Sequence, residues 1–271
     1  MEKIRLDVLL TEKGFFDSRE KARRVIMAGS VYVNNQKYDK PGTKVDIDSK
    51  IDIRGNVFPY VSRGGLKLEK AIKEFNIILK DLICIDIGAS TGGFTDCMLQ
   101  NYAKKVYTID VGYGQLDWKL RQDPRVVTME RTNIRYVKPE DLVDLADFVS
   151  IDVSFISLKL VLPVVKNLIN DSAEIVALIK PQFEAGRENV GKKGVVKDIN
   201  IHKEVVSEIV EFAKEMNFHI SNFSFSPIKG PEGNIEYLIH LKNIRDKQDI
   251  SIEKIYNNIE QSHIELNTNS N

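Results

Sequence analysis

The stretch ICIDIGASTGGFTD, residues 83–96, joins a short apolar run to a glycine-rich turn. The apolar run is typical of a buried β-strand, and glycines after a strand let a ligand approach the backbone closely. A strand, such a turn and a helix open the βαβ unit of a nucleotide-binding α/β domain. We therefore expect a parallel sheet with a ligand site at this turn. The alternative is a turn that only packs the helix against the strand.

The chain that follows this turn continues the α/β pattern. A second strand at 106–109 ends at Asp110, where an acidic side chain can accept both ribose hydroxyls of an adenosine. Further strands are expected at 126–129, 148–153, 175–179, 218–225 and 237–241, and helices at 92–101, 157–170 and 201–216. The fold class is α/β, with the ligand site beyond the carboxyl ends of the strands.

Two nucleotide cofactors fit this outline, and the glycine spacing separates them. The dinucleotide fingerprint G-x-G-x-x-G requires a glycine at Ser90, where the backbone approaches a pyrophosphate. Asp86, two residues before Gly88, gives instead the pattern D-x-G-x-x-x-G-G, which is familiar from methyltransferases that use S-adenosylmethionine (SAM). We therefore expect SAM as the cofactor and disfavour a dehydrogenase.

Composition excludes several classes of protein. The 271 residues hold 39 basic and 39 acidic side chains and 42% hydrophobic residues, which is typical of a globular chain rather than a disordered or collagen-like one. The sequence lacks an apolar run long enough to span a membrane, and we expect a cytoplasmic protein. Cys84 and Cys97 form no zinc-type pair, so we expect two core thiols and no metal.

The zero net charge conceals a difference along the chain. Residues 1–80 hold 17 of the basic and 11 of the acidic side chains. Helices are expected near 5–13 and from Asp17 to Ala28, followed by short strands at 31–33 and within 44–53, with a turn at Asn34-Asn35. Basic side chains of the second helix could neutralise phosphates, although a solvated surface is the alternative. The side chains expected to contact RNA in and beyond this region are Arg5, Arg19, Arg23, Arg24 and Arg63.

Polar side chains gather in four later segments. These are SRGGLKL at 62–68, IDVSF at 151–155, IKPQFE at 179–184 and GNIEY at 233–237. The charged residue of each segment, taken alone, is explained as a surface charge or a helix cap. Together, the four segments supply Lys67, Asp152, Lys180 and Glu236. Asp152 and Lys180 are expected at strand ends, where ligands bind in open α/β sheets.

With these motifs in place, the chain resembles a known family. Residues 5–53 are similar to the small RNA-binding domain named after ribosomal small-subunit protein four, an α+β module. Residues 5–242 together resemble the TlyA family of ribosomal RNA 2′-O-methyltransferases, whose catalytic domain is similar to that of FtsJ (RrmJ). The resemblance implies a Rossmann-like SAM-dependent methyltransferase domain and a cytidine target in 23S and, for longer members of the family, also in 16S ribosomal RNA. The implied domains are 1–53, a linker at 54–62, a catalytic domain at 63–242 and a C-terminal helix and tail at 243–271.

The resemblance also implies a role for each site residue. Lys67, Asp152, Lys180 and Glu236 map to the FtsJ-like catalytic tetrad. Lys180 would be the base, since a lysine acts so at neutral pH when burial and a second cation, here Lys67, lower its pKa. Asp152 would orient Lys180, and Glu236 would fix Lys67 or the ribose. The implied cofactor-binding residues are Asp86, Gly88, Ser90, Gly92, Gly93, Phe94, Asp110, Asn133 and Asp152, although the FtsJ-type aspartate is absent near Asn133.

Two further segments bear on function, and two other functions compete with methylation. Residues 186–197 form a long basic loop that either closes over RNA or is merely solvated, and residues 252–259 predict a docking helix. The competing functions are a non-catalytic RNA-binding or ribosome-assembly factor and a membrane-lysing haemolysin, the name given to some relatives. We expect instead a monomeric enzyme whose partner is ribosomal RNA or a ribosomal subunit, with neither membrane nor metal involved.

Overall fold

The computed structural model describes residues 3–16, 19–27, 29–54, 59–244 and 248–268, without the side chains of Glu20, Lys21, Arg24, Asn267 and Thr268. The chain divides into two compact units, Met1–Pro59 and Tyr60–Asn271. The linker expected at 54–62 lies partly outside the described residues. Each unit has its own hydrophobic core.

The first unit is a small α+β module. Its elements are β1 (Lys3–Arg5), α1 (Leu6–Glu12), α2 (Arg19–Met27), β2 (Val31–Val33), β3 (Gln36–Tyr38), β4 (Lys44–Asp46) and β5 (Ile51–Ile53). Strand β1 pairs with β4, and β2 lies between β3 and β5. Asn34 and Asn35 both have positive φ, 51° and 68°, which fits the tight turn that joins β2 to β3. The expected helices are present, but the strands β1 and β3 were not foreseen.

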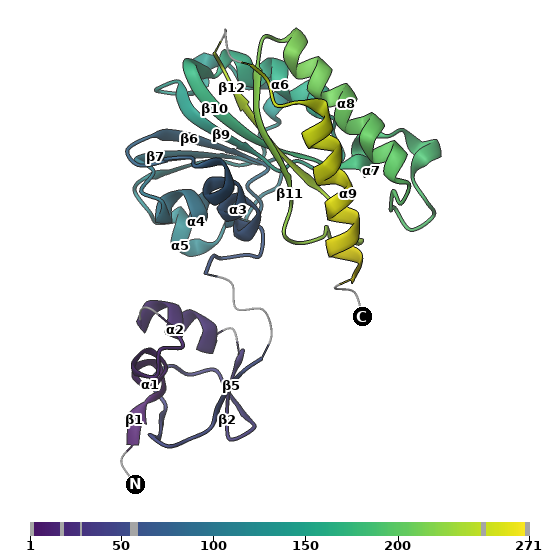
Figure 1. The fold of residues 1–271 in the computed structure, drawn as a ribbon. Helices are drawn as coiled ribbons and strands as arrows, with labels where there is room; N and C mark the ends of the chain where they lie inside the picture. Colours follow the sequence, from purple (N-terminus) through teal and green to yellow (C-terminus); the bar gives the residue numbers. More distant parts are fainter. Residues whose placement is uncertain (1–2, 17–18, 28, 55–58, 245–247, 269–271) are drawn as a thin grey trace. The chain divides into compact units, whose positions relative to one another are not determined.

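The second unit is built on a sheet of seven strands in the order β11-β12-β10-β9-β6-β7-β8 (Figure 1). The strands are β6 (Ile83–Ile87), β7 (Lys105–Ile109), β8 (Val126–Met129), β9 (Ala146–Ile151), β10 (Ile169–Ile179), β11 (His219–Phe225) and β12 (Tyr237–Lys242). Neighbouring strands from β8 through β7, β6 and β9 to β10 are parallel, whereas β12 is antiparallel to both β10 and β11. Strand β10 begins six residues before the expected start, because its first half extends beyond the apolar run that predicted it.

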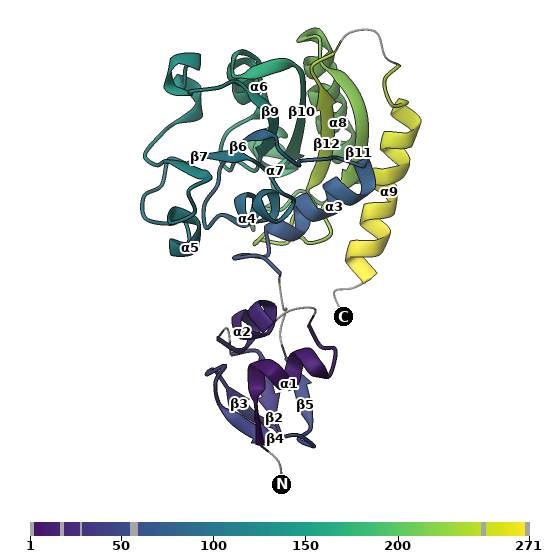
Figure 2. The same ribbon diagram turned by 90° about the vertical axis from the view of Figure 1, so that its left-hand side faces the viewer.

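Helices cover both faces of this sheet, as Figures 1 and 2 show. Helices α3 (Gly65–Phe75), α4 (Gly93–Gln100) and α5 (Trp118–Arg121) lie on one face. Helices α6 (Leu158–Asn167), α8 (Ile199–Glu215) and α9 (Ile252–Thr268) lie on the other, and the short α7 (Pro181–Glu184) follows β10. Strand alternation directs Cys84 and Asp86 toward α3 and α4 and directs Ile85 and Ile87 to the opposite core.

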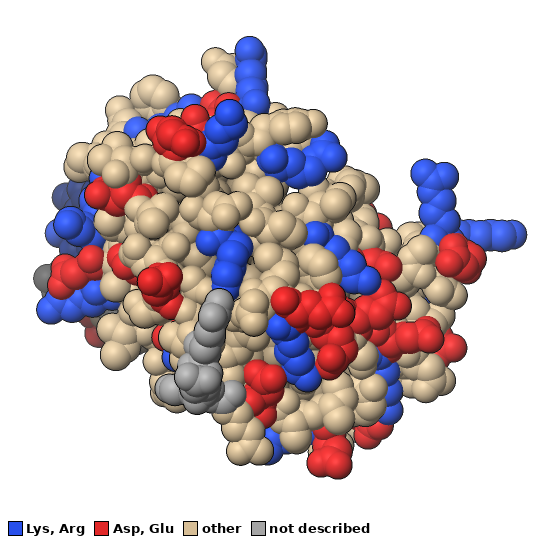
Figure 3. All heavy atoms as spheres, turned by 90° about the horizontal axis from the view of Figure 1, so that it is seen from above, with Lys and Arg blue, Asp and Glu red and all other residues tan. Residues whose placement is uncertain are grey.

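Three features bear on the sequence expectations. Helix α3 was not foreseen, whereas the expected C-terminal helix is present and buries Ile255 and Ile259. Cys84 and Cys97 are free buried thiols on the α3–α4 face. On the face seen in Figure 3, basic and acidic side chains lie interspersed.

Candidate active site

The topology brings chemistry-bearing residues to one edge of the sheet. Gly88, Asp110, Asp152 and Lys180 each follow the last residue of a parallel strand, β6, β7, β9 and β10. Glu236 comes immediately before β12, which runs antiparallel and pairs Tyr237 with Ile179 of β10. The residue before β12 therefore lies at the same edge as the residues after the parallel strands. This is the edge at which open α/β sheets bind ligands.

Gly88 shows why the turn after β6 requires a glycine. Its φ is +82°, and a Cβ placed on it would lie 2.4 Å from the backbone oxygen of Asp152. Its N–H donates to the carbonyl of Ile109, while the N–H of Asp152 donates to the carbonyl of Ile87. The ends of β6, β7 and β9 are thereby held together with no room for a side chain at position 88.

Asp86 lies beneath this turn. Its carboxylate is fully buried and accepts hydrogen bonds from the Thr95 N–H at 2.9 Å, the Thr95 hydroxyl at 2.6 Å and the Ser150 hydroxyl at 3.1 Å. Burial raises the pKa of Asp86 to about 7, against the effect of these hydrogen bonds. Asp86 was expected to contact the cofactor, but here it ties the start of α4 to β6 and β9.

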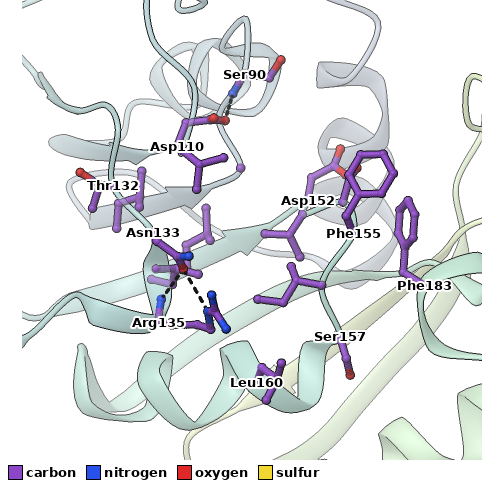
Figure 4. A pocket seen from close by; sticks show the side chains of 18 of the residues that line it. Ser90, Asp110, Thr132, Asn133, Arg135, Asp152, Phe155, Ser157, Leu160 and Phe183 are labelled. Carbon is purple, nitrogen blue, oxygen red and sulfur yellow. Dashed lines mark hydrogen bonds between the residues drawn. The ribbon is translucent and has the colours of Figure 1, made fainter.

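A cavity of about 650 Å³ opens at this edge (Figure 4). In the view, Asp110, Thr132 and Asn133 lie on one side of it and Asp152, Phe155 and Phe183 on the other. The Asp110 carboxylate is oriented by two backbone donors, the Ser90 N–H at 2.8 Å and the Gly112 N–H at 2.7 Å. The Asn133 carboxamide oxygen accepts from the Arg135 N–H at 3.1 Å.

A second, smaller cavity of about 310 Å³ adjoins the first, larger cavity. Lys67, Lys180 and Glu236 line it together with Arg63 and Lys229. The residues lining both cavities are Gly88, Ser90, Asp152 and Ser154, so the two cavities meet at these residues. Of the expected cofactor residues, Gly93 and Phe94 line the second cavity, whereas Asp86 and Gly92 are not among the described residues that line either.

The four residues of the expected tetrad form one ion cluster. Lys67 Nζ lies 2.6 Å from Glu236 Oε2 and 3.3 Å from Asp152 Oδ2. Lys180 Nζ lies 2.6 Å from Asp152 Oδ1 and 4.0 Å from Glu236 Oε1, and it donates to the Ser154 hydroxyl at 3.2 Å. Each lysine therefore faces both carboxylates in a largely buried site.

Electrostatics keep two members of this cluster charged. Burial alone would lower the pKa of Lys67, but the charges of Asp152 and Glu236 outweigh burial and raise the pKa above its usual value. Burial likewise opposes ionisation of Asp152, and the charges of Lys67 and Lys180 reverse that effect and lower its pKa. Lys67 is therefore held as a cation and Asp152 as an anion, and Lys180 contacts Asp152.

The residues expected to contact RNA are in different surroundings. Arg63 lines the second cavity, and Arg23 is exposed on α2. Arg5 and Arg19 both bond to the buried carboxylate of Asp7, at 2.9 and 3.1 Å, and the Arg5 hydrogen bond above all lowers the pKa of Asp7 to about 2. About half of each of these two guanidinium side chains stays exposed. The side chain of Arg24 lies outside the described residues.

Sequence reasoning missed the way in which Asn234 holds the basic loop. Its carboxamide oxygen accepts from the Val196 N–H at 3.1 Å, and its Nδ2 donates to the Gly194 carbonyl at 2.8 Å. The second half of the segment 186–197 is therefore attached to the loop that carries Glu236. The G-N-I-E-Y motif contained this asparagine, but only the structure shows its partners.

Phe155 was quoted in a motif but not assigned a role. Its side chain is 90% exposed and its φ is +64°, a combination that is rare for a bulky residue. The ring lies 4.9 Å from that of Phe183, centroid to centroid, and both line the larger cavity. An exposed aromatic ring at a cavity is suited to stack on a flat ligand.

The fold and this site together define an α/β methyltransferase: a glycine turn after β6, an acid after β7, and a Lys-Asp-Lys-Glu cluster where two cavities meet. The sequence pattern of the FtsJ-like methyltransferases matches residues 60–243, and that of the S4 domain matches residues 4–51. The chain belongs to the FtsJ-like methyltransferases, and within them to the TlyA family, as the resemblance predicted.

Three relatives illustrate this membership. YqxC of Bacillus subtilis, whose name describes it provisionally as an rRNA methyltransferase, is 54% identical over 97% of this chain and 95% of its own. The 16S/23S rRNA (cytidine-2′-O)-methyltransferase TlyA of Mycobacterium tuberculosis is 41% identical over 90% of this chain and 91% of its own. A solved structure from Streptococcus thermophilus, described provisionally as a hemolysin, covers 99% of this chain and 98% of its own with 50% identity and a TM-score of 0.78. None of the helices in the described ranges is long and apolar enough to cross a membrane.

Proposed function

We propose that this enzyme transfers the methyl group of SAM to the 2′-hydroxyl of a cytidine in ribosomal RNA. The observation that carries the proposal is the Lys67–Asp152–Lys180–Glu236 cluster at the border of the two cavities. A 2′-hydroxyl is a weak nucleophile, so a site that methylates it needs a base at the hydroxyl and charges that hold this base in place.

The larger cavity fits the cofactor. Its volume of about 650 Å³ lies within the range of nucleotide-sized sites. Asp110, held by two backbone N–H groups, presents a carboxylate to the ribose hydroxyls, and Asn133 lies where the adenine would be expected. SAM, when bound, supplies a methyl group on a cationic sulfur. The anionic Asp152 at the border of the cavities favours a cation there.

The smaller cavity receives the ribose that is methylated. Lys180 Nζ first gives up its own proton to solvent and then, as a neutral amine, takes the proton that the 2′-hydroxyl loses. Asp152, 2.6 Å away, orients Lys180 for this step. Lys67 stays protonated between Asp152 and Glu236, so it holds both carboxylates in place and keeps a positive charge beside Lys180. The remaining rate acceleration arises from holding SAM and the ribose in contact where the two cavities meet.

The aromatic pair supports a nucleotide as the acceptor. Phe155 projects from the rim of the larger cavity and directly follows Ser154, which lines both cavities. Proteins that act on single nucleotides hold an unstacked base against such rings. A base stacked on Phe155 would place its own ribose near the cluster.

The S4 domain and the relatives support ribosomal RNA as the substrate. S4-type modules grip structured RNA through backbone and shape rather than sequence, and the first unit matches that family. The Mycobacterium tuberculosis relative is named for cytidine-2′-O-methylation of 16S and 23S rRNA. We infer a cytoplasmic monomer that meets ribosomal RNA or a ribosomal subunit as its partner.

A map of ribose methylation tests the proposal. The 2′-O-methylated positions of 16S and 23S ribosomal RNA would be compared between cells with and without the gene. We expect at least one cytidine to lose its 2′-O-methyl group without the gene and to regain it when the gene is restored. Identical maps, or a change in base methylation alone, would contradict the proposal.

A further inference from the structure

The two lysines of the cluster differ in the oxygens that lie nearest to them. Lys67 Nζ lies close to two carboxylates, at 2.6 Å from Glu236 and 3.3 Å from Asp152. Lys180 Nζ lies close to one carboxylate, at 2.6 Å from Asp152, because Glu236 Oε1 is 4.0 Å away. The second oxygen near Lys180 is the hydroxyl of Ser154, at 3.2 Å. A neutral group therefore lies beside Lys180 where Lys67 has a second anion.

The Ser154 hydroxyl has no structural role in its own turn. Within the described part of the chain, its one hydrogen bond is the bond that Lys180 Nζ donates to it. Ser157 shows the structural use of such a hydroxyl, since it accepts from the Lys159 N–H at the start of α6 and donates to Glu184. Ser154 is instead exposed and lines both cavities. The contact with Lys180 is therefore the interaction that explains this hydroxyl.

The turn after β9 supplies both oxygens that lie near Lys180. Asp152 directly follows β9 and Ser154 comes two residues later, whereas Lys180 follows the parallel neighbour β10. The other charged residues that line the smaller cavity come from elsewhere in the chain; they are Arg63, Lys67, Lys229 and Glu236. Among the described residues, Ser154 is thus the uncharged hydrogen-bond partner of Lys180.

A lysine that acts as a base must first lose a proton. A carboxylate beside an ammonium opposes that loss, and two carboxylates raise the pKa of Lys67 even against burial. A hydroxyl accepts a hydrogen bond from the ammonium but adds no charge, so it orients Nζ with less resistance to deprotonation. The neutral amine keeps two N–H groups for Asp152 Oδ1 and Ser154 Oγ, which leaves its lone pair for the 2′-hydroxyl.

We propose that Ser154 is a positioning residue for Lys180, and that its neutral hydroxyl selects Lys180 rather than Lys67 as the base of the cluster. This inference rests on the proposed function and adds what distinguishes the two lysines of the site. The hydroxyl holds Nζ in one orientation without the second close carboxylate that keeps Lys67 protonated. Ser154 acts through Lys180 and takes no proton from the ribose.

The first experiment introduces a charge at Ser154. Wild type, Ser154→Asp and Ser154→Asn are saturated with SAM and with ribosomal subunits from cells that lack the gene, and the single-turnover rate of methyl transfer is measured against pH. In Ser154→Asp, Lys180 faces two close carboxylates as Lys67 does. We expect the rate near pH 7 to fall about 10-fold and the pH dependence to move upward by about 1 pH unit. Ser154→Asn has a similar size without the charge and should keep the pH dependence of the wild type.

The second experiment removes the hydroxyl. Ser154→Ala should lower the single-turnover rate about 10-fold without moving the pH dependence, with affinities for SAM and for subunits within about twofold of the wild type. Ser154→Thr keeps the hydroxyl and should restore most of the rate. A merely structural role would not give this division between rate and affinity. Urea unfolding of each variant checks that the fold is intact.

Ser172→Asp is the matched control for the added charge. Ser172 is exposed on β10, roughly 25 Å of strand before Lys180. We expect its rate and its pH dependence to stay near those of the wild type. The proposal is overturned if Ser154→Asp keeps the pH dependence of Ser172→Asp, or if Ser154→Ala transfers the methyl group as fast as the wild type. It is also overturned if Ser154→Ala loses SAM affinity while its rate at saturation is unchanged, since Ser154 would then serve the cofactor.

Failure of the proposed function is a separate result. If the wild type transfers no methyl group to either subunit, the proposed function fails. The titration of Lys180 is then followed by NMR on the full chain with isotope-labelled lysine ε-carbons, its signal being the one that is absent from Lys180→Arg. A titration midpoint that is higher in Ser154→Asp than in the wild type supports the role of the neutral hydroxyl, and equal midpoints overturn it.

Discussion

Lys180 Nζ lies 2.6 Å from Asp152 Oδ1, although the two residues follow different strands. The contact follows from the sheet, because β9 and β10 are parallel neighbours in which Ile151 pairs with Ala177. Asp152 and Lys180 therefore leave the sheet at neighbouring strand ends, one and three residues beyond this pair. Since backbone pairing sets this contact, the sheet itself brings Lys180, the proposed base, next to the Asp152 carboxylate.

Gly88→Ala should damage both stability and activity. The new Cβ would lie 2.4 Å from the backbone oxygen of Asp152, at a φ that alanine adopts only with strain. We expect a loss of about 1–3 kcal/mol in the free energy of unfolding and a large fall in kcat, because Asp152 must shift. Urea unfolding and methyl transfer would measure these effects.

Gly114→Ala is the control for that experiment. Its φ of +71° imposes a similar backbone strain, but nothing lies within 4 Å of its Cβ position. We expect a smaller loss of stability and near-normal turnover. Equal losses in the two variants would show that the contact with Asp152 has no role.

Phe155→Ala should weaken substrate binding without weakening the fold. Because the ring is 90% exposed, its removal should change the free energy of unfolding by less than about 0.5 kcal/mol. Loss of a stacking partner should raise the KM for ribosomal subunits about 10-fold. Tyr102→Ala is the control, since Tyr102 is 73% exposed, also has positive φ and lines neither described cavity. An unchanged KM in Phe155→Ala would rule out the stacking role.

His202 should make the enzyme labile in acid. Its Nε2 contacts the Val196 carbonyl at 3.0 Å, its Nδ1 contacts the Tyr237 hydroxyl at 2.6 Å, and burial lowers its pKa to about 4. Because the folded-state pKa lies below the unfolded value of about 6.5, its stabilising contribution is complete above pH 6.5 and is lost as the pH falls toward 4.

Comparing the wild type with His202→Gln separates the effect of His202 on stability in acid from the effect of the carboxylates. Between pH 7 and pH 4.5, the wild type should lose roughly 2–3 kcal/mol more of its free energy of unfolding than the variant does. His263, whose pKa burial and the charge of Lys229 also lower, stays in both proteins. Parallel stability curves from urea titrations would contradict the expectation.

The sequence predicted the parts of this molecule that depend on local pattern. The glycine turn after β6, Asp110 after β7, and the strand ends that carry Asp152 and Lys180 follow from apolar runs and their termination. Helix α3 was missed because the residues that lead into it, Ser62 to Gly65, contain glycines and polar groups that are typical of a loop. Lys67 was therefore selected from a conspicuous polar segment and by resemblance, not by its place on a helix.

Long-range packing explains the features that the sequence did not predict. Asp86 has the position of a ligand-binding acid in the sequence, but strand alternation directs it to the buried face, where Thr95 and Ser150 satisfy it. The partners of Asn234 lie on a segment distant in sequence, and no local pattern reports them. The position of Lys229 at the cavity likewise depends on the path of the loop that also carries Glu236.

The central claim is that Lys180 accepts the proton of a ribose 2′-hydroxyl. The most direct test measures methyl transfer from SAM to ribosomal subunits by Lys180→Ala and Lys180→Arg, together with the SAM affinity of each. The arginine keeps the charge beside Asp152 but cannot deprotonate. We expect turnover to fall at least about 100-fold in both variants while SAM affinity stays within about threefold of the wild type. Near-normal turnover by either variant would contradict the account.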